Sequence, residues 1–348
     1  MSYRIHRVDL QKDKNEAISF WKANFPNWPE EKYFWFYENN PYGDALCWLA
    51  KVKGENACVG STALFPRRVC LNGRYITAAI AGDYAVAEKH RGFWPAWMLQ
   101  RAALSELNNT QIDFLYASPN ELAEHIMERA GYKIIGSSIR LVKVLRSVDY
   151  VQRLVKIQPV SKLLSKPVDI FLRSISREAY TRNTGKFDYE VLISFDKRFD
   201  VLWKEASPYY RIIGERSSRF LNWRFSQCPY LDYKAFALTQ KKTNRILGYI
   251  VYQIVKKELQ IADLFLIDMD ELFDDLMAQF LRYQRNQGID SVSIGYFGNE
   301  SLVKQMERFS FSRREYHRSF AVYASKESAN TFLLDRNNWY FMEADNDI

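Results

Sequence analysis

The sequence predicts an α/β (α+β) fold in which one unit, a mixed central sheet flanked by helices, occurs twice. Three observations predict it. At 348 residues the chain is longer than a single hydrophobic core usually organises. Two blocks of sequence recur in the same order in both halves. Late in each half, strand patterns alternate with helical patterns, as in α/β and α+β folds.

The repeat rests on two pairs of blocks. WFYENNPYGDALCWLAKVKGENACVG (35–60) aligns without a gap with WRFSQCPYLDYKAFALTQKKTNRILG (223–248), and the two share seven of 26 positions. NELAEHIMERAGY (120–132) and NESLVKQMERFSF (299–311) share five of 13. The offsets are 188 and 179 residues, and chance identity at ordinary composition is roughly 6% per position. We therefore interpret the two halves as products of a duplication.

Each half is expected to begin with a strand and helices, followed by a polar turn after Pro-Tyr. Two strands joined by a turn before Gly60 or Gly248 come next, then a strand, a helix, a strand, the repeated helix and a closing strand. The first half has nine more residues between its blocks. They fit a hairpin, RRVCLNGRYITAA, because Asn72-Gly73 is a strong signal for a two-residue turn.

The predicted domains are residues 1–148 and residues 187–348, joined by a basic helical linker over 149–186. Residues 140–186 contain eleven Lys or Arg and three Asp or Glu, an excess of +8 that equals the net charge of the chain. One interpretation is a solvated linker packed on both domains. The alternative is peripheral contact with an anionic membrane surface or a polyanionic partner.

Several classes of protein are disfavoured. The N-terminus lacks the apolar region of a signal peptide, and no long uncharged apolar run occurs, so we expect a cytoplasmic protein. The four cysteines and four histidines are scattered, which argues against a zinc site or disulfides. The pair Asp268 and Asp270 is interpreted as an acidic helix start rather than a metal site. GxSxG, GxxxxGK[ST] and GxGxxG are absent.

Residues 81–136 carry a recognisable pattern. "V.P.yRGkGig..L" corresponds to Val86 through Leu99, and "N..A.......GF" corresponds to Asn120, Ala123, Gly131 and Tyr132. This stretch resembles the core of the GNAT acetyltransferase superfamily. The second half looks like a more degenerate copy. The tandem is similar to double-GNAT acyltransferases of Fem-like and surface-polysaccharide-associated systems.

The resemblance implies that acetyl-CoA lies along the strand Gly82–Ala87, with its pyrophosphate at the turn and helix start His90–Ala96. Helix N-termini favour anions, and Arg91 adds a cation. The implied cofactor-binding residues are Tyr84, Ala85, Val86, Arg91, Gly92, Phe93, Trp94, Ala96 and Asn120.

The sequence departs from the family pattern at several points. Trp94 stands where a glycine usually lets backbone approach phosphate, and Pro95 removes an N–H donor. Met127 and Met306 stand where many relatives carry a tyrosine that protonates the leaving thiolate, so that acid is absent or supplied from elsewhere. Asn120 is equally well explained as a helix cap.

Asp83 is the predicted catalytic base, because it lies on the strand before the phosphate turn. Asp263 occupies the equivalent position at an offset of 180, so a structural role common to both halves is the alternative.

The predicted function is an acyltransferase that moves an acetyl or related acyl group from CoA, without a metal. Its acceptor is an amine or hydroxyl of a small molecule or a surface-polysaccharide precursor, bound in a cleft that the second domain completes. The alternatives are a Fem-like aminoacyltransferase that uses aminoacyl-tRNA, and a non-catalytic binding protein that kept the fold.

Overall fold

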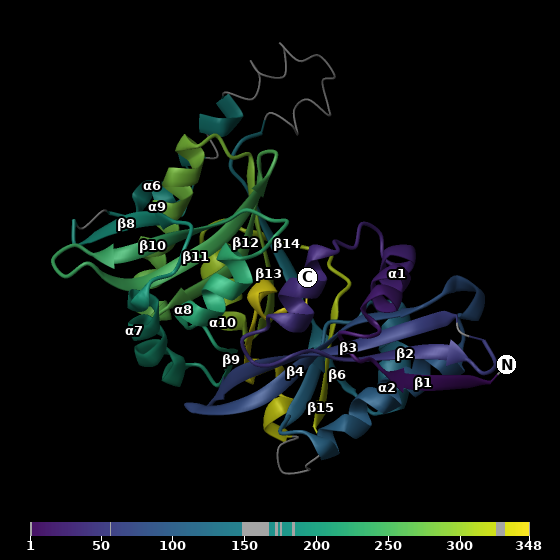
Figure 1. Ribbon diagram of the computed structural model, residues 1–348. Helices are drawn as coiled ribbons and strands as arrows, with labels where there is room; N and C mark the ends of the chain where they lie inside the picture. The colour runs from purple at the N-terminus through teal and green to yellow at the C-terminus, as the bar shows by residue number, and fades with distance from the viewer. Residues whose placement is uncertain are drawn as a thin grey trace.

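The computed structural model describes residues 2–55, 57–147, 167–170, 173–174, 176–182, 185–324 and 331–347. It has two sheet-and-helix halves with the end of the chain between them (Figure 1). The strands are β1 (Tyr3–Arg7), β2 (Leu46–Val52), β3 (Cys58–Leu71), β4 (Arg74–Val86), β5 (Phe114–Ala117), β6 (Lys133–Ser137), β7 (Ile139–Val144), β8 (Phe187–Leu192), β9 (Ile212–Gly214), β10 (Tyr233–Gln240), β11 (Arg245–Val255), β12 (Glu258–Leu266), β13 (Ser291–Gly298), β14 (Ser312–Arg314), β15 (Ser319–Ala324) and β16 (Trp339–Phe341).

The α-helices are α1 (Lys14–Asn24), α2 (Phe93–Ser105), α3 (Glu121–Ala130), α6 (Arg177–Tyr180), α7 (Lys197–Ala206), α8 (Ser218–Leu221), α9 (Met269–Asn286) and α10 (Glu300–Arg308). Short helices of other types are η1 (Tyr33–Glu38), η2 (Glu88–His90), η3 (Glu106–Asn109), η4 (Ser207–Tyr209), η5 (Asn222–Ser226), η6 (Arg336–Asn338) and η7 (Glu343–Asp345).

The first half is a mixed sheet in the order β1-β2-β3-β4-β5, with helices on both faces. Neighbouring strand residues point to opposite faces, so Phe65 packs in the cluster that contains α1 residues, whereas Leu64 packs with Leu99 of α2. The β3–β4 hairpin turns at Asn72 and Gly73, whose φ angles are +47° and +78°. The two-residue turn predicted there is confirmed.

The second half repeats this strand order as β8-β10-β11-β12-β13. The helix that opens each repeated block has the same start, because Asn120 caps α3 and Asn299 caps α10 through their side chains. Gly131, at φ +124°, ends α3. The predicted α/β class is confirmed, with mixed sheets flanked by helices in both halves.

The two halves exchange their closing strands, which the sequence did not predict. β15 lies between β5 and β6 of the first half, and β7 lies between β13 and β14 of the second. The reason is visible in the connection: one residue, Ser138, separates β6 from β7, whereas a tight hairpin needs at least two. β7 therefore continues away from β6, and β15 takes the equivalent position in the first sheet.

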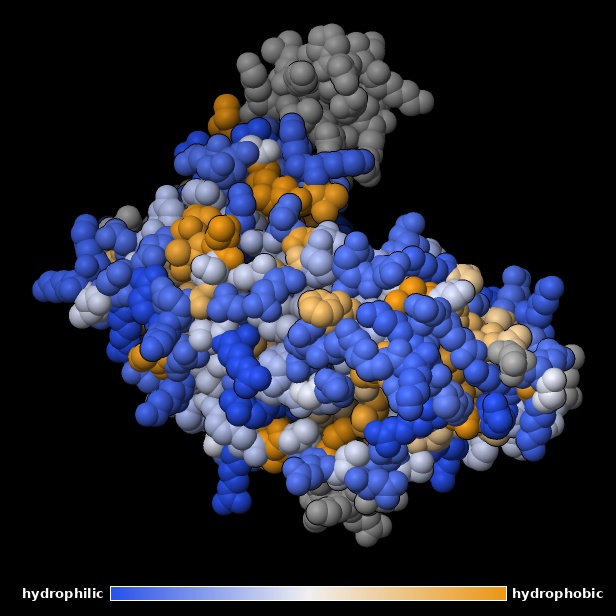
Figure 2. Space-filling view, viewed as in Figure 1, coloured by the Kyte–Doolittle hydropathy of each residue, from blue (hydrophilic) through white to orange (hydrophobic). Residues whose placement is uncertain are grey.

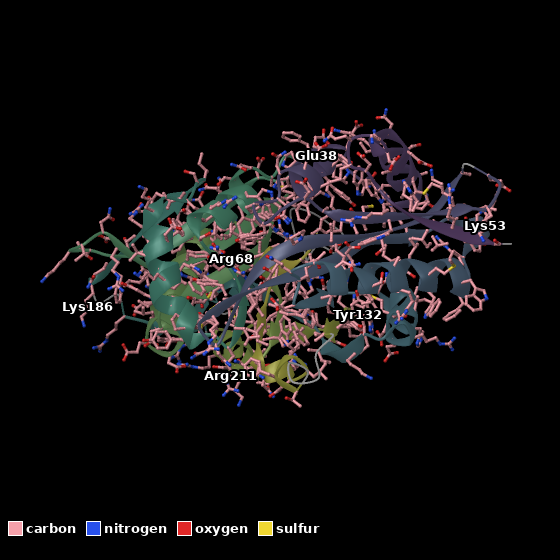
Figure 3. The ribbon with its side chains drawn as sticks, turned by 60° about the horizontal axis from the view of Figure 1, so that its bottom comes forward. Glu38, Lys53, Arg68, Tyr132, Lys186 and Arg211 are labelled. Carbon is pink, nitrogen blue, oxygen red and sulfur yellow. The ribbon has the colours of Figure 1, made fainter. Side chains whose placement is uncertain are left out.

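The exchange of strands means that the predicted segments 1–148, 149–186 and 187–348 do not each contain a complete sheet. Each half contributes a strand to the other, and β3 also pairs with β9 across the junction. Figure 3 labels Arg68 on this hairpin, and its guanidinium contacts Glu215 of the second half. The boundaries stay a prediction, but units cut there would not fold with complete sheets. Most of the predicted linker lies outside the described residues.

Aromatic residues join the halves at a point of local two-fold symmetry. Trp35 Nε1 donates to the Trp223 carbonyl at 2.6 Å, and Trp223 Nε1 donates to the Trp35 carbonyl at 3.1 Å. Reciprocal contacts of this kind mark a two-fold relation. The neighbouring aromatics Tyr33, Phe36 and Tyr37 are buried as well, whereas Phe34 is 65% exposed.

The last described segment, residues 331–347, crosses from the second half to the first. β16 pairs with β9 and β13, and η7 follows it. Arg216 holds this segment through a two-point ion pair with Asp345, at 2.7 Å on each oxygen. Arg224 donates to the carbonyl of Glu343. We refer to residues 339–347 as the tail.

On the face shown in Figure 2, hydrophilic residues predominate and hydrophobic ones form separate groups. Among the described residues, no helix has the length and apolar character needed to cross a bilayer. Contact of residues 140–186 with a membrane or polyanion stays a prediction.

Candidate active site

A split between two strands forms the centre of the site in the first half. β4 and β5 run in parallel and pair only where Ala78–Ile80 faces Phe114–Tyr116. β4 then continues to Val86 with β3 on its other side. From Ala81 onward its edge toward β5 has no strand partner among the described residues, so its backbone groups are available to a ligand.

The residues predicted to bind the cofactor lie along this open strand and at its end. Tyr84, Ala85 and Val86 are half-buried on β4. Burial raises the pKa of Tyr84, so its hydroxyl stays protonated near neutral pH. Gly92 is the N-cap residue of α2, and Phe93, Trp94 and Ala96 lie in its first turn.

The start of α2 is electropositive and open. No side chain caps the helix, so the N–H groups of Phe93 and Trp94 have no intrahelical partner. Arg91, directly before Gly92, is exposed. Pro95 stands within the first turn, where its missing N–H costs the helix nothing. The arrangement fits a bound anion.

Trp94 does not fill the space that the family glycine would leave. Its side chain is 63% exposed and packs edge-to-face on Phe93 and Trp97. The large ring therefore lies mostly outside the turn.

Asn120 serves as a helix cap in the structure. Its Oδ1 accepts a hydrogen bond from the backbone N–H of Ala123 at 3.0 Å. This is the structural role that the sequence offered as the alternative to cofactor binding, and contact with a cofactor stays a prediction. Met127, where a proton donor was sought, is buried.

Asp83 lies in a β-bulge and is held from both sides. Its φ is +44°, unusual for a residue other than glycine, and the register of β3 against β4 shifts here. Lys32 Nζ donates to Oδ1 at 2.8 Å, and the Tyr37 hydroxyl donates to Oδ2 at 2.6 Å. Both carboxylate oxygens are engaged, which favours a positioning role over proton abstraction.

A second carboxylate, which sequence reasoning missed, lies where the strands part. A Cβ added to Gly82 would lie only 1.9 Å from Asp347 Oδ2, so this carboxyl group rests against the Gly82 backbone. The pKa of Asp347 is raised, and burial is the largest cause. Nearby Lys32 acts in the opposite direction, whereas the charge of Asp83 raises the pKa further. On the β5 side, the Tyr116 hydroxyl donates to the Asp345 carbonyl at 3.1 Å. The tail thus spans the apex of the split.

The second half has the same split, but the tail occupies it. β12 and β13 pair only up to Ile261 and Ile294, and β16 then pairs with Phe297 and Gly298. The Tyr340 hydroxyl donates to the Leu264 carbonyl on β12 at 2.5 Å. A Cβ at Gly298 would lie 2.1 Å from the Trp339 carbonyl, so the approach of the two backbones requires glycine. This split is closed to a ligand.

A cavity of about 1090 Å³ lies beyond the closed split, at the start of α9. Its wall includes four carboxylates, from Glu205, Asp268, Asp270 and Glu271. Asp268 Oδ1 accepts from the backbone N–H groups of Asp270 and Glu271 at 3.0 and 2.9 Å. The helix start is already capped by an anion, and the surrounding charge opposes a phosphate. Arg211, labelled in Figure 3, lies in the same wall.

Asp263 matches Asp83 in position but is structural. It lies at a register shift of β11 against β12 and is fully buried. Arg216 Nε donates to its Oδ2 at 2.9 Å and the Tyr249 hydroxyl donates at 2.8 Å. Burial raises the pKa of Asp263 against the opposing effect of Arg216. Within the described residues, no group of three His, Cys, Asp or Glu could hold a metal ion.

The open split, the bulge and the uncapped helix all lie in one segment of the first half, and that segment matches a known family. Residues 4–135 match the acetyltransferase (GNAT) domain. The resemblance predicted for residues 81–136 is confirmed. The GNAT domain contains the open strand, the start of α2 and Asp83. A search of curated proteins found no match to the chain.

Solved structures of acyltransferases and a probable acyltransferase match most of the chain. A GCN5-related N-acetyltransferase from Anabaena variabilis superposes with a TM-score of 0.65 at 14% identity, over 93% of this chain and 73% of that one. A conserved protein from Enterococcus faecalis, described as a probable N-acyltransferase, gives 0.63 at 12%, over 93% and 73%. Saccharomyces cerevisiae N-myristoyltransferase with bound myristoyl-CoA gives 0.58 at 10%, over 93% and 79%. At these identities the likeness shows the fold.

Proposed function

We propose that the protein is an N-acyltransferase that takes its acyl group from a CoA thioester bound in the first half. The observation that carries the proposal is the difference between the two splits. In the first half the tail reaches β4 only at the apex, near Gly82, the strand edge from Tyr84 to Val86 has no strand partner among the described residues, and the start of α2 is uncapped beside Arg91. In the second half β16 occupies the split and acidic residues surround the start of α9.

Each part of the first half has a chemical role in this proposal. The free N–H groups of Phe93 and Trp94, with Arg91, hold the pyrophosphate. The unpaired edge of β4 bonds the amides of the pantetheine arm. The thioester supplies an activated acyl carbon, and a ligand that follows the strand inward ends at Gly82, where β4 meets β5.

Asp347 is the base in this proposal, in place of Asp83. The acceptor nitrogen must lose a proton to attack the acyl carbon, while the C–S bond breaks and the thiolate leaves. Asp347 lies at the apex of the split, and its raised pKa improves its capacity to accept that proton near neutral pH. Asp83, fixed by Lys32 and Tyr37, sets the bulge that shapes the apex.

We also propose that the two halves arose by duplication. The strand order is the same in both, and the bulged aspartates Asp83 and Asp263 lie at equivalent positions. The exchange of β7 and β15 and the reciprocal hydrogen bonds of Trp35 and Trp223 support the same idea.

The other predicted functions keep their place as alternatives for the tests. A surface-polysaccharide precursor as acceptor and an aminoacyl-tRNA as donor rested on the tandem resemblance and on residues 140–186. A non-catalytic protein would bind CoA, or nothing, without transfer.

Isothermal titration with CoA and acetyl-CoA tests the cofactor site. Replacing Arg91 with alanine is expected to weaken binding about ten- to a hundred-fold, because a charge-assisted hydrogen bond contributes about 1.5–3 kcal/mol. Arg211→Ala is the matched control, since Arg211 lies in the wall of the second-half cavity, and it should change the affinity less than two-fold. Absence of CoA binding, or a larger effect of Arg211→Ala, contradicts the proposal.

A further inference from the structure

A small polar cavity lies between the halves, beside the apex of the split. Its volume is about 180 Å³. Ser118, which follows β5, lies in its wall together with Asn346, the tail residue before Asp347. Asp347, the next residue of the tail, rests against Gly82, so the wall of the cavity is one residue away from the apex of the split.

The exchanged strand builds this cavity. Ser138, just before β7, and Arg140, in β7, come from the first half, whereas Ser293 comes from β13 of the second. The tail closes the remaining side with Glu343 and Asn346. Neither half alone would contain it.

One buried polar atom in the wall lacks a partner. Asn346 Oδ1 makes no hydrogen bond within the described residues. Leaving a buried polar atom unpaired costs about 1–3 kcal/mol, so this atom indicates a ligand with a hydrogen-bond donor.

The two charged side chains in the wall, Arg140 and Glu343, differ in whether they have partners. Arg140 forms no ion pair with any described residue, is exposed, and contributes to the wall of the cavity. Glu343 is engaged, since the Tyr233 hydroxyl donates to Oε1 at 3.2 Å and Gln260 Nε2 donates to Oε2. Burial raises the pKa of Glu343. The free charge is therefore positive and lies on Arg140, with the serine hydroxyls as further donors.

We propose that this cavity binds the acceptor, and that the acceptor is a small amine that also carries a carboxylate, as an α-amino acid does. The amine lies at Asn346, whose unpaired amide oxygen accepts a hydrogen bond from it, and beside Asp347, which takes its proton. The carboxylate lies at Arg140, whose guanidinium can hold it by two parallel hydrogen bonds. This inference rests on the proposed function and narrows its acceptor.

Thiol release from acetyl-CoA with a panel of amines tests it. The panel pairs amino acids with their amides and with the amines that lack the carboxyl group. The free amino acids are expected to show kcat/KM values at least ten-fold higher. Arg140→Ala should remove that preference by raising KM for the amino acids and leave the carboxyl-free amines unchanged, and Arg140→Lys should restore part of it.

A binding measurement separates this inference from the function it rests on. Titration of amino acids and their amides into the CoA complex should show binding of the free acids, lost in Arg140→Ala, with CoA affinity unchanged. CoA binding together with equal binding or use of acids and amides overturns the inference alone. Absence of CoA binding overturns the proposed function. Arg313 is an exposed arginine on β14. Its replacement by alanine serves as the control and should change neither amino-acid binding nor CoA affinity.

Discussion

Replacing Asp347 with asparagine is expected to lower kcat by about a hundred- to ten-thousand-fold, the usual contribution of a positioned base, without weakening CoA binding. The dependence of kcat on pH tests the role of Asp347 more directly. As the base, Asp347 must be deprotonated, so kcat falls as pH is lowered through its pKa, which burial raises above the ordinary aspartate value. Asp347→Asn should remove this acid limb.

Two further variants show which of the two carboxylates, Asp347 or Asp83, acts as the base. Gly82→Ala places a methyl group on the Asp347 carboxyl without removing it, and it should reproduce much of the loss. Asp83→Asn leaves Lys32 with a weaker partner and should lower kcat while the acid limb persists. If the limb disappears in Asp83→Asn and remains in Asp347→Asn, Asp83 is the base, as the sequence predicted.

The second large effect is expected on stability. Arg216 is fully buried and pairs with two carboxylates, Asp263 and Asp345. Arg216→Met leaves both carboxylates buried without their cation, and removal of one partner of a buried pair costs about 3–5 kcal/mol. The free energy of unfolding, from urea denaturation, should fall by that amount. Because Asp345 anchors the tail, acyl transfer should be lost as well.

An exposed arginine with two partners is the control. Arg313 contacts Glu300 at 2.7 Å and Glu307 at 2.8 Å, but it lies at the surface. Exposed ion pairs contribute at most about 1 kcal/mol, so Arg313→Met should change the free energy of unfolding by less than that. Similar effects of the two variants would show that the buried cluster does not hold the tail.

Local signals in the sequence predicted much of the fold. Asn72-Gly73 needs positive φ at both residues and so fixes a hairpin, and Asn120 with Gly131 marks both ends of α3. The open strand and the start of α2 were also predicted, because the resemblance to the GNAT superfamily rests on residues 81–136, which contain both. These features depend on residues close together in the chain.

The exchange of closing strands and the tail could not be predicted in the same way. Because the two halves have the same strand order, the patterns of β7 and β15 suit either sheet, and the single residue between β6 and β7 was the available signal. Asp347 lies 265 positions after Gly82, so no spacing connects them. Asp83 was chosen for its strand, whereas its engagement by Lys32 and Tyr37 depends on tertiary packing.

Hydrogen–deuterium exchange with and without acetyl-CoA tests the central claim, that the thioester binds in the first half and not in the second. Slower exchange in residues 82–97, with no change in residues 263–272 at the start of α9, is the predicted result. Protection of residues 263–272, or of neither segment at saturating ligand, would contradict the account.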